Sequence, residues 1–313
     1  VLRATVDGQN VMRPASVFAM DVSRQVTLPQ QVAAPKLVAE IDCVTQEPTY
    51  FGNGKTRVTT HANMTYRESA DQGNYTHGWK QSSWFAYTLD DLAVGKAYRV
   101  QVDYPDDKVR TFTVSLVDQP RYGHDDHLIP YPLDSGVASG GEFVNTNTMQ
   151  TLNIDFVARR TDARVLFFNW HGPLRAAAAK IRLYQTDDQY PALELAHKSQ
   201  RHQAIFFEEY DRWYGYFGAL DDSQSELLKA ADRYARWCQS AGIDTFWDTV
   251  AIYGTTCWPS KVIDNARVRG FLRDDHYPTG IVWPLLLTAE RYGMRYFAEL
   301  HPTQNMVTLP DEK

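Results

Sequence analysis

The stretch Tyr98-Arg99-Val100-Gln101-Val102-Asp103-Tyr104 decides the first part of the fold, because apolar and polar side chains alternate along it. A period of two is typical of a β-strand with one buried face and one solvated face. Turn-forming residues such as Val94-Gly95-Lys96 and Ser139-Gly140-Gly141 separate this stretch from others like it. Those other segments are Leu37–Cys43, Trp84–Leu89, Thr111–Leu116, Thr151–Val157 and Arg164–Phe168. Residues 37–186 are therefore predicted to form an antiparallel β-sandwich or jelly roll.

The periodicity changes near residue 200. Between Ser225 and Cys238, apolar residues recur at helical spacing, so five side chains share one face of a predicted helix. That group is Leu228, Ala231, Tyr234, Ala235 and Cys238. Ser223 and Ser225 are both candidates for the N-cap, and Gly242 is a helix stop.

Two helix–strand units follow from this change. A strand is predicted over Ile243–Tyr253, a second helix over Trp283–Tyr292 with Gly293 as its stop, and a second strand over Met294–Pro302. Helix, glycine and strand in repetition indicate a parallel β/α domain. A closed barrel takes eight strands and about 250 residues, so residues 187–313 are expected to be a partial, barrel-like (β/α) segment completed by residues outside this chain.

The remaining residues, 1–36, are predicted to be an extended arm or linker because of prolines such as Pro29 and Pro35. The fold class expected for the whole chain is multidomain β plus α/β.

Composition narrows the classes of partner. The 313 residues carry a net charge of −6, which argues against nucleic acid. No apolar run approaches the ~20 residues that span a bilayer, and the first residues do not resemble a signal peptide. Neither G-x-G-x-x-G nor a P-loop motif occurs, which disfavours a nucleotide enzyme. The 8 Trp, 18 Tyr and 14 Phe suit either sugar stacking or β-sandwich cores.

Three segments of the first part resemble a galactose-binding-like jelly roll, a carbohydrate-binding-module-like domain appended to glycoside hydrolases. They are Trp79–Tyr87, Tyr98–Tyr104 and Ala177–Tyr184. Residues 200–313 resemble the first two β/α units of TIM-barrel glycoside hydrolases. The resemblance implies an extracellular, periplasmic or cell-surface protein of bacterial multidomain type that acts on a polysaccharide. The alternative is a non-catalytic surface, assembly or glycan-binding protein.

In a (β/α) enzyme the site lies at the carboxyl ends of the strands. That rule selects Trp247, Asp248 and Tyr253 on the first strand, and Glu299 and His301 on the second, as substrate-binding residues. Glycosidases need two carboxyl groups, and in many TIM-barrel glycosidases the pair sits on later strands. No residue here is assigned as catalytic acid or nucleophile.

The sandwich offers two further candidate sites. Trp79 and Trp84 are predicted to stack on sugar. Trp84 and Tyr87 are an odd number of residues apart, so they face opposite ways on a regular strand, and at least one of these two side chains lies in the core. Asp125 and Asp126 are candidate ligands for a structural calcium.

No other cofactor is required, and the oligomeric state is left open. Among the three cysteines, Cys238–Cys257 is the most plausible disulfide.

Overall fold

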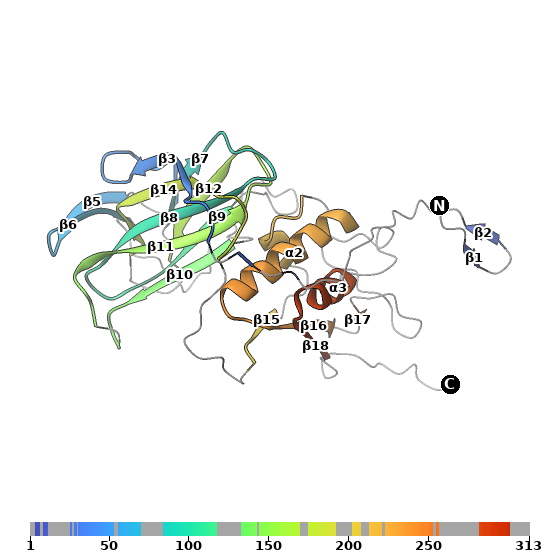
Figure 1. The fold of residues 1–313 in the computed structure, drawn as a ribbon. Coiled ribbons are helices and arrows are strands. Elements are labelled where there is room, and N and C mark those ends of the chain that lie inside the picture. The colour runs from blue at the N-terminus through green and yellow to red at the C-terminus, as the bar shows by residue number, and fades with distance from the viewer. Residues whose placement is uncertain are drawn as a thin grey trace, which may run out of the picture.

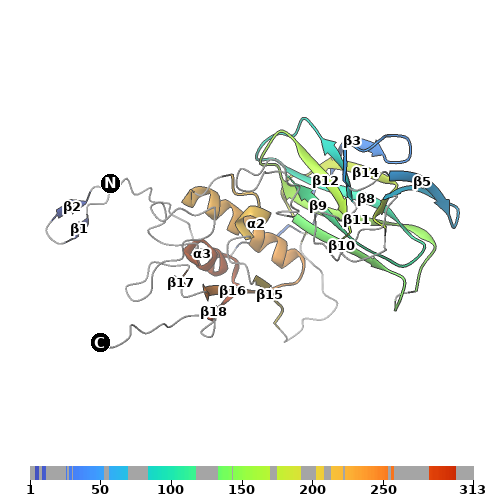
Figure 2. The same cartoon turned by 180° about the vertical axis from the view of Figure 1, so that it is seen from behind.

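The computed structural model describes most of two folded bodies, which lie side by side (Figure 1, Figure 2). The described residues are 4–6, 9–11, 26, 28–29, 31–52, 56–69, 84–117, 133–142, 144–169, 175–191, 202–207, 213–220, 223–252, 255–256 and 282–300. One body is an antiparallel β-sandwich, and the other is a smaller α/β unit. A short hairpin of β1 (Ala4–Val6) and β2 (Gln9–Val11) precedes both.

Two antiparallel sheets form the sandwich, as the alternating segments predict. The first has the order β10-β9-β12-β7-β4, and the second has the order β11-β8-β14-β3. Their strands are β3 (Lys36–Asp42), β4 (Tyr50–Gly52), β7 (Trp84–Leu89), β8 (Ala97–Asp106), β9 (Arg110–Val117), β10 (Leu133–Ser139), β11 (Thr148–Val157), β12 (Ala163–Phe168) and β14 (Lys180–Gln185). A third sheet, β13-β6-β5, was not anticipated; it contains β5 (Thr56–His61), β6 (Met64–Ser69) and β13 (Ala177–Ala178).

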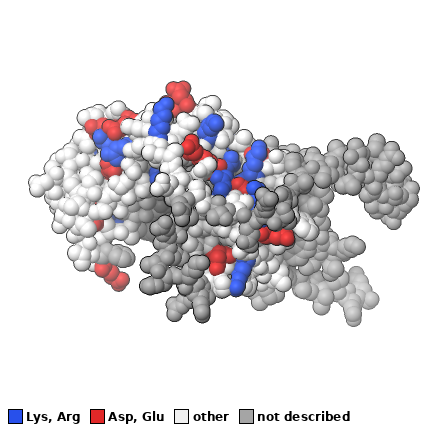
Figure 3. Space-filling model, in the orientation of Figure 1, with Lys and Arg blue, Asp and Glu red and all other residues white. Residues whose placement is uncertain are grey.

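Strand β8 shows how alternation divides the sandwich into core and surface. Val100 and Val102 are fully buried in the core between the two sheets. Their neighbours on the opposite side pair across strands: Arg99 Nε lies 2.7 Å from Asp155 Oδ1, and Arg182 lies 2.8 Å from Asp103. Figure 3 shows cations and anions interspersed on the face in view, consistent with this pairing. The outer face of this sheet is therefore a ladder of charge pairs and not an aromatic platform.

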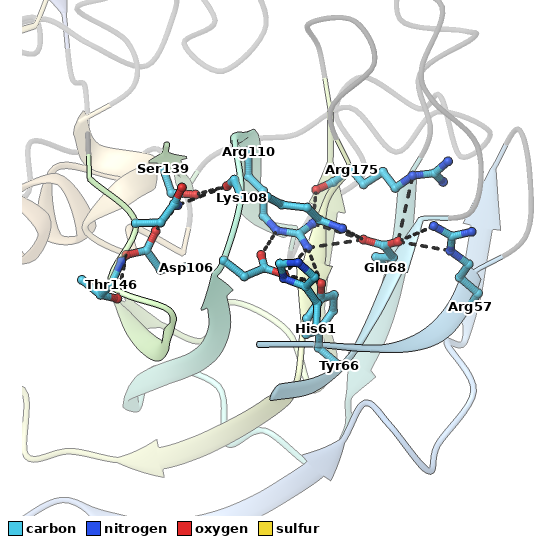
Figure 4. A network of polar contacts seen from close by, with 12 residues as sticks. Arg57, His61, Tyr66, Glu68, Asp106, Lys108, Arg110, Ser139, Thr146 and Arg175 are labelled. Atoms are coloured by element: carbon cyan, nitrogen blue, oxygen red, sulfur yellow. Dashed lines mark hydrogen bonds and ion pairs between the residues drawn. The ribbon is translucent and has the colours of Figure 1, made fainter. Parts of the chain in front are cut away.

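A buried ionic network joins the third sheet to the sandwich (Figure 4). The fully buried Arg110 guanidinium donates to Asp107 Oδ1 at 2.9 Å and to the Tyr66 hydroxyl at 2.8 Å, and it lies 3.3 Å from Glu68 Oε2. Burial alone would raise the pKa of Glu68. The hydrogen bond from Arg57 and the charges of Lys108 and Arg110 outweigh it and hold that pKa below its ordinary value.

The segment Pro105-Asp106-Asp107-Lys108 has turn-forming residues, and its sequence alone predicts a simple hairpin turn. The chain bends at Asp107–Lys108 after β8, but β8 and β9 belong to different sheets, so the segment connects two sheets and is not a hairpin turn. Both aspartates are also buried acceptors. Asp106 Oδ2 accepts from the Thr146 backbone N–H at 2.8 Å, and Asp107 pairs with Arg110. The hairpin prediction is therefore wrong, although the chain does bend at this point, and the sequence does not indicate the buried role of the two aspartates.

We expect Arg110→Ala to lower the free energy of unfolding by about 3–5 kcal/mol, because it leaves the buried Asp107 and Glu68 charges undercompensated. Arg57→Ala is the matched control: Arg57 also pairs with Glu68, but its side chain is 54% exposed, so its loss should cost at most about 1 kcal/mol. Urea denaturation measures both. Equal losses for the two variants would contradict a dominant role for the buried cation.

The α/β unit confirms the predicted helix–strand units. β16 (Thr245–Ile252) pairs in parallel with β18 (Arg295–Leu300) on one edge and with β15 (Ala204–Phe207) on the other. The short β17 (Thr255–Thr256) pairs antiparallel with β16. β15 and β17 were not anticipated. The strands described here form an open sheet, so the closed barrel is not confirmed.

Helices α2 (Gln224–Ser240) and α3 (Val282–Tyr292) pack on one face of this sheet, and the single-turn α1 (Trp213–Tyr216) packs against α2. The Ser223 side chain accepts from the Glu226 backbone N–H, which selects Ser223 as the N-cap. Gly242 and Gly293 follow the helices with φ of +75° and +62°, the left-handed conformation expected of helix stops.

The core-facing stripe of α2 differs from the prediction in its first half, where Glu226 and Ala230 are also buried. Ala231, Tyr234, Ala235 and Cys238 are buried as expected, but Leu227 is the buried leucine and Leu228 lies at the edge. Cys238 is a free thiol in this core, so the expected Cys238–Cys257 disulfide is not formed. Burial raises the pKa of Cys238 and of Cys43, the latter to about 12.

The two bodies touch closely at Gly218, which follows α1. Gly218 has φ +74°, and a Cβ placed there would lie 2.4 Å from Val157 Cβ at the end of β11. The N-terminal arm also reaches the α/β unit, since the Val26 N–H donates to the Arg291 carbonyl at 3.0 Å. Across the described ranges, no helix is long and apolar enough to cross a membrane.

We expect Gly218→Ala to destabilise the protein by more than the roughly 1 kcal/mol that a left-handed glycine replacement usually costs, because the methyl group also collides with Val157. Gly95→Ala is the matched control: Gly95 has φ +80° but open space around it. Thermal unfolding of both variants measures the difference, and identical melting temperatures would refute the close contact.

Candidate functional site

Three aromatic side chains form a row across the open face of the parallel sheet. The register places Phe206 of β15 beside Trp247 of β16, and Trp247 beside Phe297 of β18. The ring centroids of Phe206 and Trp247 are 5.4 Å apart, and the three residues are 45%, 44% and 56% exposed. This aromatic row presents apolar area to solvent.

Alternation along the strands explains why this row is exposed. The residues one position earlier, including Phe246 and Tyr296, face α2 and α3, where the ring of Phe246 stacks on Tyr234 at 4.6 Å. Because the helices cover that face, the next residue on each strand must point to the opposite side. The row therefore follows from strand geometry and helix packing together.

Glu299 lies two residues beyond Phe297, on the same face and at the carboxyl end of β18. Its Oε2 atom accepts from the Thr249 hydroxyl at 3.2 Å, and the register pairs the two residues. A carboxylate next to an aromatic row can accept hydrogen bonds from ligand hydroxyls and can act in proton transfer. Trp247 and Glu299, both predicted as site residues, are thus brought to one face.

Asp248 lies on the other face, away from Trp247 and Glu299. It is 3% exposed beneath the helices, where the Tyr296 hydroxyl donates to its Oδ2 atom at 3.4 Å. Its Oδ1 atom has no hydrogen-bond partner among the described residues. Burial raises the pKa of Asp248 well above its ordinary value, and the Tyr296 hydrogen bond offsets only part of that effect.

We expect Asp248→Asn to stabilise the fold at neutral pH. With a raised folded-state pKa, the wild-type loses stability as pH rises from the unfolded-state pKa towards the folded-state pKa, because only the unfolded chain ionises freely. Removing the ionisable group should therefore raise the free energy of unfolding at pH 7, and the gain should shrink towards pH 4.

Thermal unfolding across this pH range tests the expectation. Asp244→Asn is the control of opposite sign: although burial would raise the pKa of Asp244, hydrogen bonds from His202 and Thr245 hold it below its ordinary value. That variant should lose stability at neutral pH and not in acid. A gain for Asp248→Asn that does not depend on pH would contradict the argument.

The other predicted site residues are only partly accounted for. Trp84 is half-buried on the outer face of its sheet against Leu166 and Phe168, whereas Tyr87 points into the core, so the two do face opposite ways. Trp79, Tyr253, His301, Asp125 and Asp126 lie outside the described residues. Where the structure is described, no three His, Cys, Asp or Glu side chains gather as a metal site.

Sequence reasoning missed Phe206 and Phe297. The run Ala204-Ile205-Phe206-Phe207 was a usable signal, since a short apolar run can be a buried parallel strand. Phe297 lies inside the predicted second strand, two residues before Glu299, so the two side chains point to the same face of the sheet. Alternation along the strand would therefore have identified Phe297 as a further site residue.

Comparison with known proteins gives structural neighbours only. No protein-family profile and no curated protein sequence matches the chain. A carbohydrate-binding module of lichenase 5A from Cellvibrio mixtus, in complex with cellotriose, is 12% identical with a TM-score of 0.30, covering 48% of this chain and 98% of its own. The C-terminal carbohydrate-binding module of the laminarinase LamC from Zobellia galactanivorans is 12% identical with a TM-score of 0.28, covering 47% and 98%.

A family 115 4-O-methyl-α-glucuronidase with specificity for decorated arabinogalactans is 12% identical with a TM-score of 0.32, covering 57% of this chain and 20% of its own. At these identities and TM-scores no residue role is carried from a neighbour to this chain.

Proposed function

We propose that the chain is a carbohydrate-active protein whose α/β unit binds a glycan along the aromatic row of Phe206, Trp247 and Phe297. The observation that carries the proposal is the alignment of three exposed aromatic side chains across three strands with Glu299 beside them. The apolar C–H face of a pyranose packs on an aromatic ring, and its hydroxyls donate to a carboxylate. Successive sugar residues of a polysaccharide would then contact successive strands.

The wider role we propose is that of a part of a secreted, polysaccharide-acting glycoside hydrolase, in which the sandwich is an accessory sugar-binding domain. Glu299 lies at the carboxyl end of β18, the end of the strands at which a (β/α) hydrolase has its active site. The described strands β15, β16 and β18 carry two carboxylates, Asp248 and Glu299, and these face opposite sides. The second carboxyl group of a hydrolytic pair would have to come from elsewhere.

That last observation favours a second candidate, a non-catalytic glycan-binding protein. Release of new reducing ends from a bound polysaccharide separates the two candidates. Binding with release supports the hydrolase, and binding without release supports the non-catalytic protein.

We expect Trp247→Ala to weaken polysaccharide binding at least about tenfold, because burying a large apolar side chain contributes about 1.5–3 kcal/mol and tenfold is about 1.4 kcal/mol. Affinity electrophoresis against soluble xylan, laminarin, mixed-linkage glucan and arabinogalactan, together with a glycan array, measures the loss. Glu299→Gln should weaken binding by a smaller factor, since a neutral acceptor replaces a charged one.

Trp283→Ala is the matched control. Trp283 is 50% exposed on α3, away from the aromatic row, and its loss should leave binding unchanged. Trp79→Ala and Trp84→Ala test the sandwich in the same assay. Absence of any bound glycan, or equal effects of Trp247→Ala and Trp283→Ala, would refute the proposed site.

A further inference from the structure

A second candidate site lies where the two bodies meet. A partly open cavity of about 400 Å³ lies between strand β11 of the sandwich and helices α1 and α2 of the α/β unit. Its volume is within the roughly 300–1,000 Å³ typical of small-molecule sites, which often form at domain interfaces. The aromatic row lies on the opposite face of the β15–β16–β18 sheet from α2, so the two sites are distinct.

One wall of the cavity is aromatic. Tyr216, Phe217 and Trp237 line it from the α/β side. Phe217 is held in place by stacking on Tyr234 at 4.6 Å, and its ring centroid lies 6.0 Å from that of Trp237. These rings give a ligand an apolar surface that packing has already ordered.

The other wall is polar, but its charges are already compensated. Asp155 is paired with the Arg99 guanidinium at 2.7 and 3.0 Å. Asp188 accepts from Arg233 at 2.9 Å and from Arg236 at 3.2 Å. A cation would therefore find no unpaired carboxylate here, since each of the two is matched by at least one guanidinium group. Each carboxylate still has lone pairs that can accept a hydrogen bond from a neutral donor.

One buried polar atom of this wall lacks a partner among the described residues, and a hydroxyl group lines the same cavity. Asp188 Oδ1 is buried and accepts no hydrogen bond within the described part of the chain. Tyr190 lines the same cavity, and its hydroxyl can donate a hydrogen bond. Buried polar groups are seldom left unpaired. Here an acceptor and a donor lie in the wall of one cavity, and Asp188 is held there with a left-handed φ of +55°.

We propose that this cavity binds a single neutral sugar ring. A pyranose presents an apolar C–H face to the aromatic wall and hydroxyl groups that both donate and accept. Its hydroxyls would donate to Asp188 and Asp155 and accept from Tyr190 and from the Asn153 amide, whose oxygen already accepts from Gln101 at 3.1 Å. The ring comes either from a free monosaccharide or from the end of a glycan chain.

The test is a titration of the full chain with the methyl glycosides of glucose, galactose, xylose and mannose, followed by Trp fluorescence and saturation-transfer NMR. Each titration is run on the wild-type chain and in a Trp247→Ala background, in which binding at the aromatic row should be at least about tenfold weaker. At least one methyl glycoside should bind in both. Tyr190→Phe should weaken it about tenfold through loss of one hydrogen-bond donor, and Asn153→Ala should also weaken it.

Tyr184→Phe on β14 is the matched control, since it deletes a hydroxyl from a residue that does not line the cavity, and it should leave affinity unchanged. Circular dichroism verifies the fold of each variant. No glycoside bound in the Trp247→Ala background, or binding that neither Tyr190→Phe nor Asn153→Ala weakens, would overturn the proposal. Tighter binding of methyl glucuronide or of choline than of the neutral methyl glycosides would contradict the proposal that the ligand is neutral.

A xylan or laminarin oligosaccharide in the same background separates the sources of the sugar. Binding of the oligosaccharide as tightly as the methyl glycoside indicates a glycan end. Binding of the methyl glycoside alone indicates a free monosaccharide. Both measurements are made in the Trp247→Ala background, so they can be interpreted whether or not the aromatic row binds a glycan.

Discussion

Opposite facing of successive residues along β16 is the constraint on which the candidate site depends. Phe246 packs under Tyr234 of α2, so Trp247 must face the other side. The parallel register then brings Phe206 and Phe297 to either side of Trp247. A shift of one residue in β16 would bury the tryptophan and expose Phe246, so the helix-covered core and the aromatic row have one common cause.

Local signals in the sequence were enough for most of this architecture. Ser223, Gly242 and Gly293 act through their own backbone and side-chain chemistry, and they mark the helix ends as predicted. Strand β15 has only four residues, and it is ordered by pairing with Thr245–Asp248, about forty residues further on. Leu227 rather than Leu228 entered the core because helix rotation is fixed by neighbours, which periodicity describes only approximately.

The polar chemistry was less accessible to prediction. Asp107 has the local signature of a turn, and nothing near it in sequence indicates that Tyr66, 41 residues earlier, will donate to it inside the protein. Asp248 was grouped with Trp247 by position, although alternation alone separates them. The junction cavity depends on the placement of β11 against α1 and α2, a contact between segments roughly sixty to eighty residues apart. Tertiary contacts of this kind leave no local pattern.

The glycine-to-valine contact between the two bodies has a consequence for how this protein can be divided. An accessory sandwich that is joined by a flexible linker makes no fixed contact with its neighbour, so it can be exchanged between enzymes as a unit. Here Gly218 sits flush against Val157, and Val157 is itself buried. Excising the sandwich after Gln185 would uncover that valine and remove the β11 wall of the junction cavity. Domain shuffling at this boundary would therefore have to carry both surfaces together.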